Sequence, residues 1–523
     1  AQDESRIAAR QVIEELDAWD VTSARAALDE LLRRTPDSSD LKRLDAEVLF
    51  EEGRYAESVA LFDELGVASG GTADLARATL AQTRGYLSVE SEHFVFRHPP
   101  GKDALLAPYA LEALEKAWAA LKADLGYAPP NKVPVEVYEN AEGLAKVSTL
   151  PLEAIKTSGT IAICKFNRIM FTSPKALVKG YGWLDTLSHE YVHLVVSKKS
   201  RDRVPLWIHE GLAKYLQSRW RGPAGTALSP ASAAFLAQEL KKDKLIPFER
   251  MHPSMALLPS PEDAALAYAE VFTAIEFIRG KAGEQSLSTL IEELRSGADY
   301  QTAVSRAVGL PFARFMTDWR AHLSRREFPK EAIPLSAEKR RFKEDAAQQP
   351  PKPTEKEREE IRFGDFLEIE DPEGRKLAHL GELLRTRKRE KAAVHEFARA
   401  HARVGNRSPA LSNRYAEALI KLGDLKRAEE LLTGSLGPFP EHPKTHLNLG
   451  QLYLSTDRPE LAEKAFLEVV GTDPFDPLPH AALAKIYADR QQTKLANREK
   501  AALAILAGKD PSLLLGKSAI VVR

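Results

Sequence analysis

Two histidines and a glutamate lie close together in the stretch TLSHEYVHLVV, residues 186–196. If this stretch is helical, His189 and His193 stand four residues apart on one side, where two imidazoles can converge on one metal ion. Glu190 then points about 100° away from His189, so that its carboxylate lies beside the ion and can hold a water molecule. The pattern therefore predicts a divalent metal site with a nearby proton acceptor.

The same pentapeptide can also arise by chance. In a chain of 523 residues with 13 histidines and 75 acidic residues, an accidental HExxH is expected in roughly a few per cent of cases. Taken alone, the motif leaves a surface helix with paired histidines as open as a metal site. The helix is predicted to bury its other side, since one apolar stripe follows 3- and 4-residue steps: Leu184, Leu187, Tyr191, Leu194 and Val195.

A candidate third ligand follows in PLWIHEGLAKYL, residues 205–216. Proline and tryptophan lead into a second predicted helix that carries Glu210, and the connection from His193 is long enough to lay this helix beside the first. Catalytic zinc takes three protein ligands and keeps one position open, and two histidines with a glutamate are a standard set. His209 remains open as an alternative ligand or a substrate contact. Glu210 is favoured as the ligand, because adjacent helical residues cannot both face one ion and an extra histidine is more often structural.

The two motifs together resemble the gluzincin metallopeptidases, a class that includes thermolysin and related aminopeptidases. More narrowly, the chain is similar to the peptidase-MA-like family, which often carries tetratricopeptide repeats. The similarity covers about residues 89–325 and extends through SEHFVFRHP, SGTIAI and ALAYAEVFTAIEFI.

This resemblance implies a role for each residue of the two motifs. It implies one Zn²⁺ per chain, held by His189, His193 and Glu210, with Glu190 as the general base that takes a proton from water. Relatives such as thermolysin carry an acidic residue one turn after the ligand glutamate. This chain has Lys214 there, so the usual outer partner of the ligands is not predicted.

The negative oxygen that develops during peptide hydrolysis needs a further hydrogen-bond donor. Related enzymes take it from a downstream histidine or tyrosine, for which Tyr268 is the best-placed candidate; a buried core tyrosine is the alternative. Tyr181, Tyr191 and Tyr215 are rivals for the same role. One turn before His189, Asp185 is expected either to contact a ligand imidazole or to cap the helix.

Internal repeats appear on both sides of these motifs. Near the C-terminus, small residues recur every 34 positions, which resembles the tetratricopeptide repeat and its closely crossing helix pairs. Three or four such units are expected over about 373–510. A weaker version over 5–86 predicts two or so further pairs, with a generic helical bundle as the alternative. The recurring residues are Ala416, Gly450 and Ala484, and again Ala428, Ala462 and Ala496.

The segment between the repeats breaks the period. HFVFRH and KVPVEVY alternate as strands, a long helical stretch separates them, and SGTIAICKFNRIMFTSP reads as a hairpin turning near 165–168. Almost everything after about residue 180 reads as helix, which favours an α+β domain. In zincin folds, an edge strand such as this hairpin supplies can pair with an extended peptide.

The predicted architecture is multidomain and mostly α, with a central α+β zincin-like domain between two α-helical repeat regions. Its expected parts are N-terminal repeats at 1–88, a gluzincin-like domain at 89–330, a charged, proline-bearing linker at 331–371, and C-terminal repeats at 372–523.

Composition excludes several other classes. A net charge of −1 gives no global signal for nucleic acid, and no apolar run approaches the length of a membrane span. The single cysteine, Cys164, rules out an intrachain disulfide and has no activating base nearby in sequence. Because Ala1 opens a polar stretch, as after signal-peptide removal, a periplasmic or secreted location is expected, with a cytoplasmic one as the alternative.

The predicted function is zinc-dependent hydrolysis of peptide bonds, with the repeat arms recruiting a peptide or protein substrate or protein partners. Endopeptidase action is slightly favoured over aminopeptidase action, because no acidic cluster is seen that would bind a substrate N-terminus. The alternative is a catalytically inert zincin-like scaffold whose repeats mediate protein–protein interaction.

Overall fold

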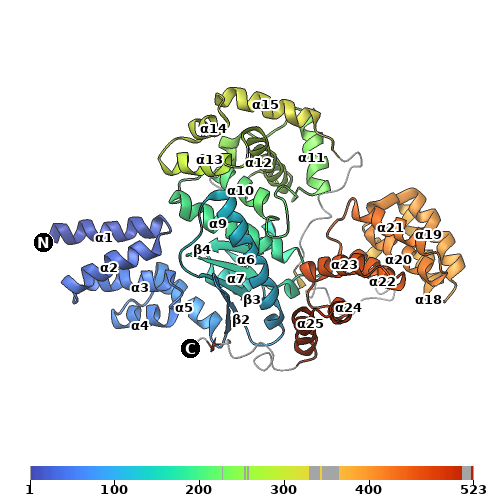
Figure 1. The fold of residues 1–523 in the computed structure, drawn as a ribbon, viewed down its shortest axis with the longest axis horizontal. Coiled ribbons are helices and arrows are strands. Elements are labelled where there is room, and N and C mark those ends of the chain that lie inside the picture. Colours follow the sequence, from blue (N-terminus) through green and yellow to red (C-terminus); the bar gives the residue numbers. More distant parts are fainter. Residues whose placement is uncertain are drawn as a thin grey trace.

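The computed structural model of the chain forms three groups of elements: N-terminal helices, a central region around one sheet, and C-terminal helices on the other side (Figure 1). This arrangement confirms the predicted fold class, a mostly helical multidomain chain. The structure describes residues 2–226, 228–252, 255, 258–328, 342–343, 364–508 and 520–521.

A six-stranded mixed sheet forms the centre, in the order β4-β5-β3-β2-β1-β6. β2, β3 and β5 run parallel to one another, and the remaining pairs are antiparallel. The two predicted strands and the predicted hairpin are confirmed as β2, β3 and β4–β5, whereas β1 and β6 were not predicted. The strands are β1 Leu87–Glu90, β2 Phe94–His98, β3 Val133–Tyr138, β4 Ala162–Lys165, β5 Arg168–Thr172 and β6 Ile520–Val521.

The β4–β5 hairpin ends in a tight two-residue turn. Phe166 and Asn167 have φ angles of 54° and 55°, the left-handed conformation that a type I′ turn needs at both central positions. This turn sets β4 at one edge of the sheet. Within the described residues, the outer side of β4 therefore carries no neighbouring strand.

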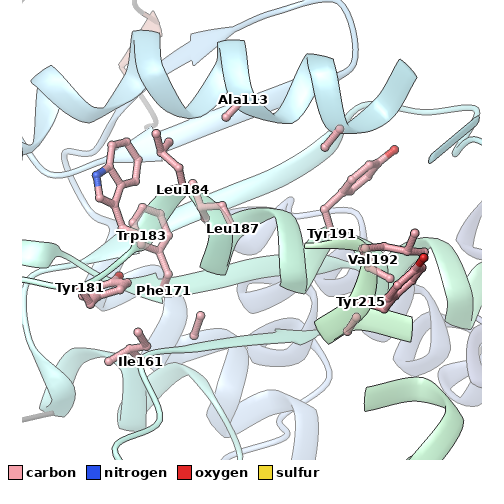
Figure 2. Close-up of a cluster of buried hydrophobic side chains, with 14 of the residues drawn as sticks. Ala113, Ile161, Phe171, Tyr181, Trp183, Leu184, Leu187, Tyr191, Val192 and Tyr215 are labelled. Atoms are coloured by element: carbon pink, nitrogen blue, oxygen red, sulfur yellow. The ribbon is translucent and has the colours of Figure 1, made fainter. Parts of the chain in front are cut away.

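Two helices cover one face of the sheet: α6 Ala107–Leu125 and α9 Trp183–Ser200. Trp183 stacks on Phe171 of β5 with ring centroids 6.4 Å apart, and Tyr191 meets Phe94 of β2 edge-on at 5.1 Å. Leu184 and Leu187 lie in the same buried cluster (Figure 2). The predicted apolar stripe of α9 is thus confirmed, so the opposite side of this helix is left for other contacts.

The chain after α9 is helical, as expected. α10 packs on α9 and on α12, and the helices that follow complete the central region. The helices are α10 Leu206–Leu216, α11 Pro230–Lys241, α12 Pro261–Ala282, α13 Ser286–Arg295, α14 Tyr300–Val308 and α15 Phe312–Arg325. Shorter elements are η1 Lys102–Leu106, α7 Ala141–Val147, α8 Leu152–Ser158, η2 Pro174–Ala176 and η3 Phe248–Met251.

The N-terminal helical region contacts the other face of the sheet through Tyr55 and Thr79, where alternate strand residues point. Glu136 of β3 is fully buried there and accepts hydrogen bonds from Tyr55 Oη at 2.5 Å and from Tyr138 Oη at 2.7 Å. Burial raises the pKa of the Glu136 carboxyl, but Arg168 and Arg97 outweigh it and hold that pKa below its ordinary value. These helices are α1 Gln2–Asp17, α2 Val21–Arg34, α3 Ser39–Glu51, α4 Tyr55–Glu64 and α5 Gly71–Thr83.

The C-terminal helices form four successive pairs. A Cβ at Gly381 or Gly450 would come within 2.6 Å of the ring of Phe397 or Phe466, which explains the small residues at the 34-residue period. The helices are α18 Pro372–Thr386, α19 Glu390–Val404, α20 Pro409–Lys421, α21 Leu425–Leu436, α22 Pro443–Ser455, α23 Pro459–Thr472, α24 Pro477–Asp489 and α25 Thr493–Leu506, with short turns η6 Gly364–Phe366 and η7 Gly405–Arg407.

The C-terminal repeats contact the central region at the beginning of α9. The indole Nε1 of Trp183 donates to the carbonyl of Val470 at 2.9 Å, and the backbone N–H of Tyr181 donates to that of Thr472 at 3.0 Å. Most of the linker predicted at 331–371 lies outside the described residues. In the part of the chain that is described, no helix combines the length and the apolar character that crossing a bilayer requires.

One carboxyl group is buried inside α12. Glu270 is fully buried, and its Oε1 accepts the backbone N–H of Ile246 at 2.9 Å. Oε2 has no hydrogen-bond partner among the described residues. Burial raises the pKa of Glu270 to about 8, so the folded protein keeps this group protonated near neutral pH.

Replacing Glu270 by glutamine is expected to stabilise the protein at alkaline pH and to change little at pH 5. Since the folded pKa lies above the ordinary value of 4.5, the stability that Glu270 contributes is complete below about pH 4.5 and is lost as the pH rises through about 8. Glutamine cannot ionise, so the variant escapes a loss on the order of 2–4 kcal/mol. Thermal midpoints of both proteins at pH 5 and pH 8.5 measure the difference.

Glu262→Gln is the matched control, because Glu262 is an exposed carboxylate in the first turn of the same helix. It should show no gain with rising pH. A Glu270→Gln effect of equal size at both pH values would contradict the buried, protonated state.

Candidate metal centre

α9 and α10 bring the predicted metal-binding residues together. α9 carries His189 and His193 on the side turned away from the sheet core, and α10 carries Glu210. The turn between the helices begins at Arg201, where φ is 56°, and Pro205 precedes the first residue of α10. The chain can reverse there because α9 ends in the left-handed conformation that commonly stops a helix.

Three ligand atoms face one another at short range. Nε2 of His189 lies 3.1 Å from Nε2 of His193, and each of these nitrogens lies 3.6 Å from Oε2 of Glu210. All three side chains are partly exposed, between 15% and 17%, so solvent reaches the group. Among the described residues, this is the cluster of histidine and acidic side chains whose geometry suits a metal ion.

The donor set and its spacing fit zinc. Ligand atoms that surround a tetrahedral Zn²⁺ at 2.0–2.1 Å stand about 3.3 Å from one another, close to the separations found here. Oε2 of Glu210 is buried and has no hydrogen-bond partner in the described part of the chain. Burial by itself would raise the pKa of the Glu210 carboxyl. The effect of His193 and His189 is larger and opposite, so the pKa of Glu210 lies well below its ordinary value. The group therefore offers two imidazole nitrogens and one anionic carboxylate oxygen.

His209 does not occupy the position of a ligand in this arrangement. Its ring stacks beside that of His193, with centroids 4.7 Å apart, and its Nδ1 lies 2.5 Å from Nδ1 of His193. Burial and the neighbouring His193 lower the pKa of His209 to about 3, so the ring is neutral. The structure therefore does not place His209 as the third ligand. Its ring instead contacts Nδ1 of His193, the ring nitrogen that does not face the other candidate ligands.

Glu190 lies next to the three residues, on the side of α9 that faces the edge strand. Its side chain is only 8% exposed. The pKa of the Cys164 thiol in β4 lies well above its ordinary value, mainly because the thiol is buried and also because the Glu190 carboxylate is near. Glu190 therefore lies on the side of α9 that faces β4. The raised pKa keeps Cys164 a thiol.

Tyr268 lies on α12, partly buried, on the face that meets α10. Val271 and Ile275 follow it at 3- and 4-residue steps, and both touch the space beside Gly211. In the sequence of α12, Tyr268 thus comes about one turn before the residues that pack beside Gly211. Its role as oxyanion donor stays a prediction.

Two of the other candidates for the oxyanion donor, Tyr181 and Tyr191, are buried beside the sheet. Tyr181 Oη donates to the carbonyl of Thr172 at 2.5 Å, and Tyr191 Oη is buried beside Phe94. Both tyrosines belong to the buried hydrophobic cluster between α9 and the sheet (Figure 2).

Both roles expected of Asp185 are wrong. Its carboxylate accepts hydrogen bonds from Trp220 Nε1 at 2.8 Å and Arg221 Nη2 at 2.6 Å, so it holds the loop after α10. The outer contact of His189 is instead Gln217, whose Oε1 lies 3.2 Å from His189 Nδ1. Sequence reasoning missed Gln217 because its side chain meets α9 only after α10 has folded back.

Gly211 allows α10 and α12 to approach closely. A Cβ there would lie 2.7 Å from Ile275 Cγ1 and 2.8 Å from the carbonyl of Val271. Gly211→Ala is expected to destabilise the protein by about 1–3 kcal/mol, because the helices must move apart. The shift would also displace Glu210 and weaken metal binding. Thermal midpoints and Zn²⁺ titration measure the two effects.

Gly280→Ala is the control for that substitution. Gly280 lies in α12 with nothing within 4 Å of the added Cβ, so alanine should be neutral or stabilising by about 0.5–1 kcal/mol. Equal stability of the Gly211→Ala and Gly280→Ala proteins would contradict the close crossing.

Known families match three segments of the chain. Residues 113–325 match the peptidase MA superfamily, and residues 10–71 and 398–477 match the tetratricopeptide repeat. No curated protein matches the chain in sequence. The limits predicted for the individual domains stay predictions.

Solved structures share only a distant likeness. Native yeast LTA4 hydrolase is 13% identical, with a TM-score of 0.30, over 80% of this chain and 66% of that one. The Cut9–Hcn1 hetero-tetramer of APC/C is 12% identical, with a TM-score of 0.27, over 98% and 80%. A mutant of MamA is 16% identical, with a TM-score of 0.24, over 29% and 89%. Such low TM-scores carry no argument about function.

The family matches and the elements described above agree on one architecture. The central strands and helices, with the candidate metal centre on α9 and α10, lie within or beside the superfamily match, and the helix pairs on either side contain the repeat matches. The chain thus carries a peptidase MA superfamily domain between two regions of tetratricopeptide repeats.

Proposed function

We propose that this protein is a zinc-dependent metallopeptidase of the gluzincin type. The observation that carries the proposal is the meeting of two imidazole nitrogens and one carboxylate oxygen within 3.6 Å of one another, beside the buried Glu190. The HExxH motif at 189–193 and Glu210 supply these groups. The match of the surrounding segment to the peptidase MA superfamily supports the same reaction class.

One Zn²⁺ per chain would be held by His189, His193 and Glu210, and would supply the Lewis acidity that makes water a nucleophile near neutral pH. Glu190 then accepts a proton from that water at its carboxylate and later delivers it to the amine that leaves. Its low exposure supports this role, because few water molecules compete for its oxygens. Tyr268 is the proposed donor to the negative oxygen of the substrate.

The edge strand β4 is the proposed binding partner of the substrate backbone. It lies against α9 and carries Cys164 near Glu190, and its outer side has no strand neighbour in the described part of the sheet. An extended peptide can pair with such an edge as an added strand. Affinity would then come mainly from backbone hydrogen bonds, which suits endopeptidase action on varied sequences.

The repeat arms are proposed to recruit the substrate or a partner protein. The C-terminal repeats touch the first residues of α9 through Trp183. The N-terminal helices reach the β4–β5 turn, where Phe50 meets Phe166 edge-on at 5.3 Å. Proteins held by either arm would therefore be delivered next to the proposed site.

Metal analysis and cleavage-site profiling test the proposal together. The purified protein should contain stoichiometric zinc and cleave casein or members of a peptide library, and Glu190→Gln should not. If the wild type carries zinc but shows no cleavage beyond that seen with Glu190→Gln, the inert-scaffold alternative is correct.

A further inference from the structure

A chain of hydrogen bonds leads away from His193 on the side opposite Glu210. Nδ1 of His193 lies 2.5 Å from Nδ1 of His209, and Nε2 of His209 lies 3.1 Å from Ser197 Oγ. Ser197 Oγ in turn donates to Asp202 Oδ1 at 3.0 Å. Four side chains from α9, its C-terminal turn and α10 are thus joined in one line that ends on a carboxylate.

The chemistry of these groups gives the line a single direction. A histidine that offers Nε2 to a metal carries its proton on Nδ1, so His193 donates and His209 must accept at Nδ1. With Nδ1 of His209 accepting, the N–H of that ring is on Nε2, which donates a hydrogen bond to Ser197 Oγ. The hydroxyl donates its own hydrogen bond to the Asp202 carboxylate, which can only accept. Every donor meets an acceptor, and no other assignment of the protons satisfies all three contacts with a metal-binding His193.

The backbone turn after α9 supports this direction. Arg201 and Asp202 have φ angles of 56° and 57°, a left-handed conformation that residues other than glycine rarely adopt. The turn brings the Asp202 N–H to 2.9 Å from the carbonyl of Ser197 and the carboxylate onto the hydroxyl of the same residue. The strained turn is therefore closed by the contact that ends the line.

We propose that His209, Ser197 and Asp202 form a positioning relay that fixes the tautomer and ring orientation of His193 for metal binding. The proposal rests on the proposed metal site, not on peptide hydrolysis. The relay supplies the anionic outer partner that relatives place one turn after the ligand glutamate, where this chain has Lys214. His189 is held differently, by the neutral amide of Gln217.

The relay predicts a selective loss of metal affinity when a member is removed. Loss of an outer hydrogen-bond partner typically weakens metal binding 10–100-fold. Ser197→Ala and His209→Phe should therefore raise the Zn²⁺ dissociation constant of the whole chain about 10–100-fold, as measured by competition with a chromophoric chelator. Ser197→Thr keeps the hydroxyl and should restore affinity to within about threefold of wild type.

Ser188→Ala is the matched control. Ser188 lies on the same helix, is equally buried, and its hydroxyl has no hydrogen-bond partner among the described residues. Its Zn²⁺ affinity should equal that of the wild type. Equal affinities of Ser197→Ala and wild type, with unchanged circular dichroism, would overturn the relay, and this result stands even if His209→Phe fails to fold.

A second readout separates the relay from the proposed function. In metal-free protein labelled with ¹⁵N-histidine, long-range ¹⁵N–¹H spectra should show His193 protonated on Nδ1, and Ser197→Ala should shift its proton population toward Nε2. A wild type that binds Zn²⁺ and shows this shift but cleaves no peptide refutes the metallopeptidase and keeps the relay. A wild type with His193 protonated on Nε2 refutes the relay whether or not it binds metal.

Discussion

Replacing Glu190 by glutamine is expected to lower kcat by about 10²–10⁴-fold while the protein keeps one zinc ion. Glutamine has the size of glutamate but cannot accept a proton, so only the proton transfer is removed. Zinc should stay, because Glu190 is not among the three side chains whose ligand atoms face one another. Zinc content by elemental analysis and kcat on a cleaved library peptide measure the two parts.

Glu142→Gln is the control for this substitution, since Glu142 is an exposed residue of α7 paired with Lys146 at 2.8 Å. It should leave both zinc content and kcat unchanged. A Glu190→Gln protein with wild-type kcat would show that another group moves the proton. Loss of zinc from that variant would instead place Glu190 among the ligands.

Removing Glu210 is expected to weaken Zn²⁺ binding by more than the 10–100-fold that loss of an outer partner costs. Glu210 is the only carboxylate of the group, and without it only two imidazoles remain to hold a divalent cation. Hydrolysis should disappear with the metal. His193→Ala should abolish both zinc binding and activity, while circular dichroism reports intact helices, because the repeat arms do not depend on this ligand. Competition with a chelator measures the affinity of each variant.

Lys214→Ala tests the same helix without touching a ligand. Residue 214 follows Glu210 by one turn, and the outer contact of His193 comes from His209, so this variant should bind Zn²⁺ like the wild type. If Glu210→Ala instead keeps full affinity, the third ligand is wrongly assigned and His209 is the next candidate.

Local patterns were sufficient to predict much of the fold. The strands β2 and β3, the β4–β5 turn and the buried stripe of α9 follow from alternation and from 3- and 4-residue steps, because both depend on neighbours along the chain. The 34-residue period likewise predicted the close crossing at Gly450. β1 and β6 escaped prediction because short strands acquire their identity from the strand they pair with.

The outer contacts of the metal centre were harder to predict. Ser197 continues the four-residue series of His189 and His193, and this spacing could have pointed to it. Asp202 carries no such signal, since it reaches Ser197 only through the left-handed turn at Arg201. Asp185 was expected near a ligand on spacing alone, but the loop after α10 competes for it.

By itself, the sequence determined which donor atoms this protein can offer a metal and that two of them share one helix face, since residue type and helical period are local properties. Only the tertiary structure decided that Glu210 meets them, that His209 turns its Nδ1 to the outer edge of His193, and that the two repeat regions rest against the sheet and α9. These contacts join residues far apart in the chain. Their geometry depends on how buried side chains pack, which no short stretch of sequence encodes.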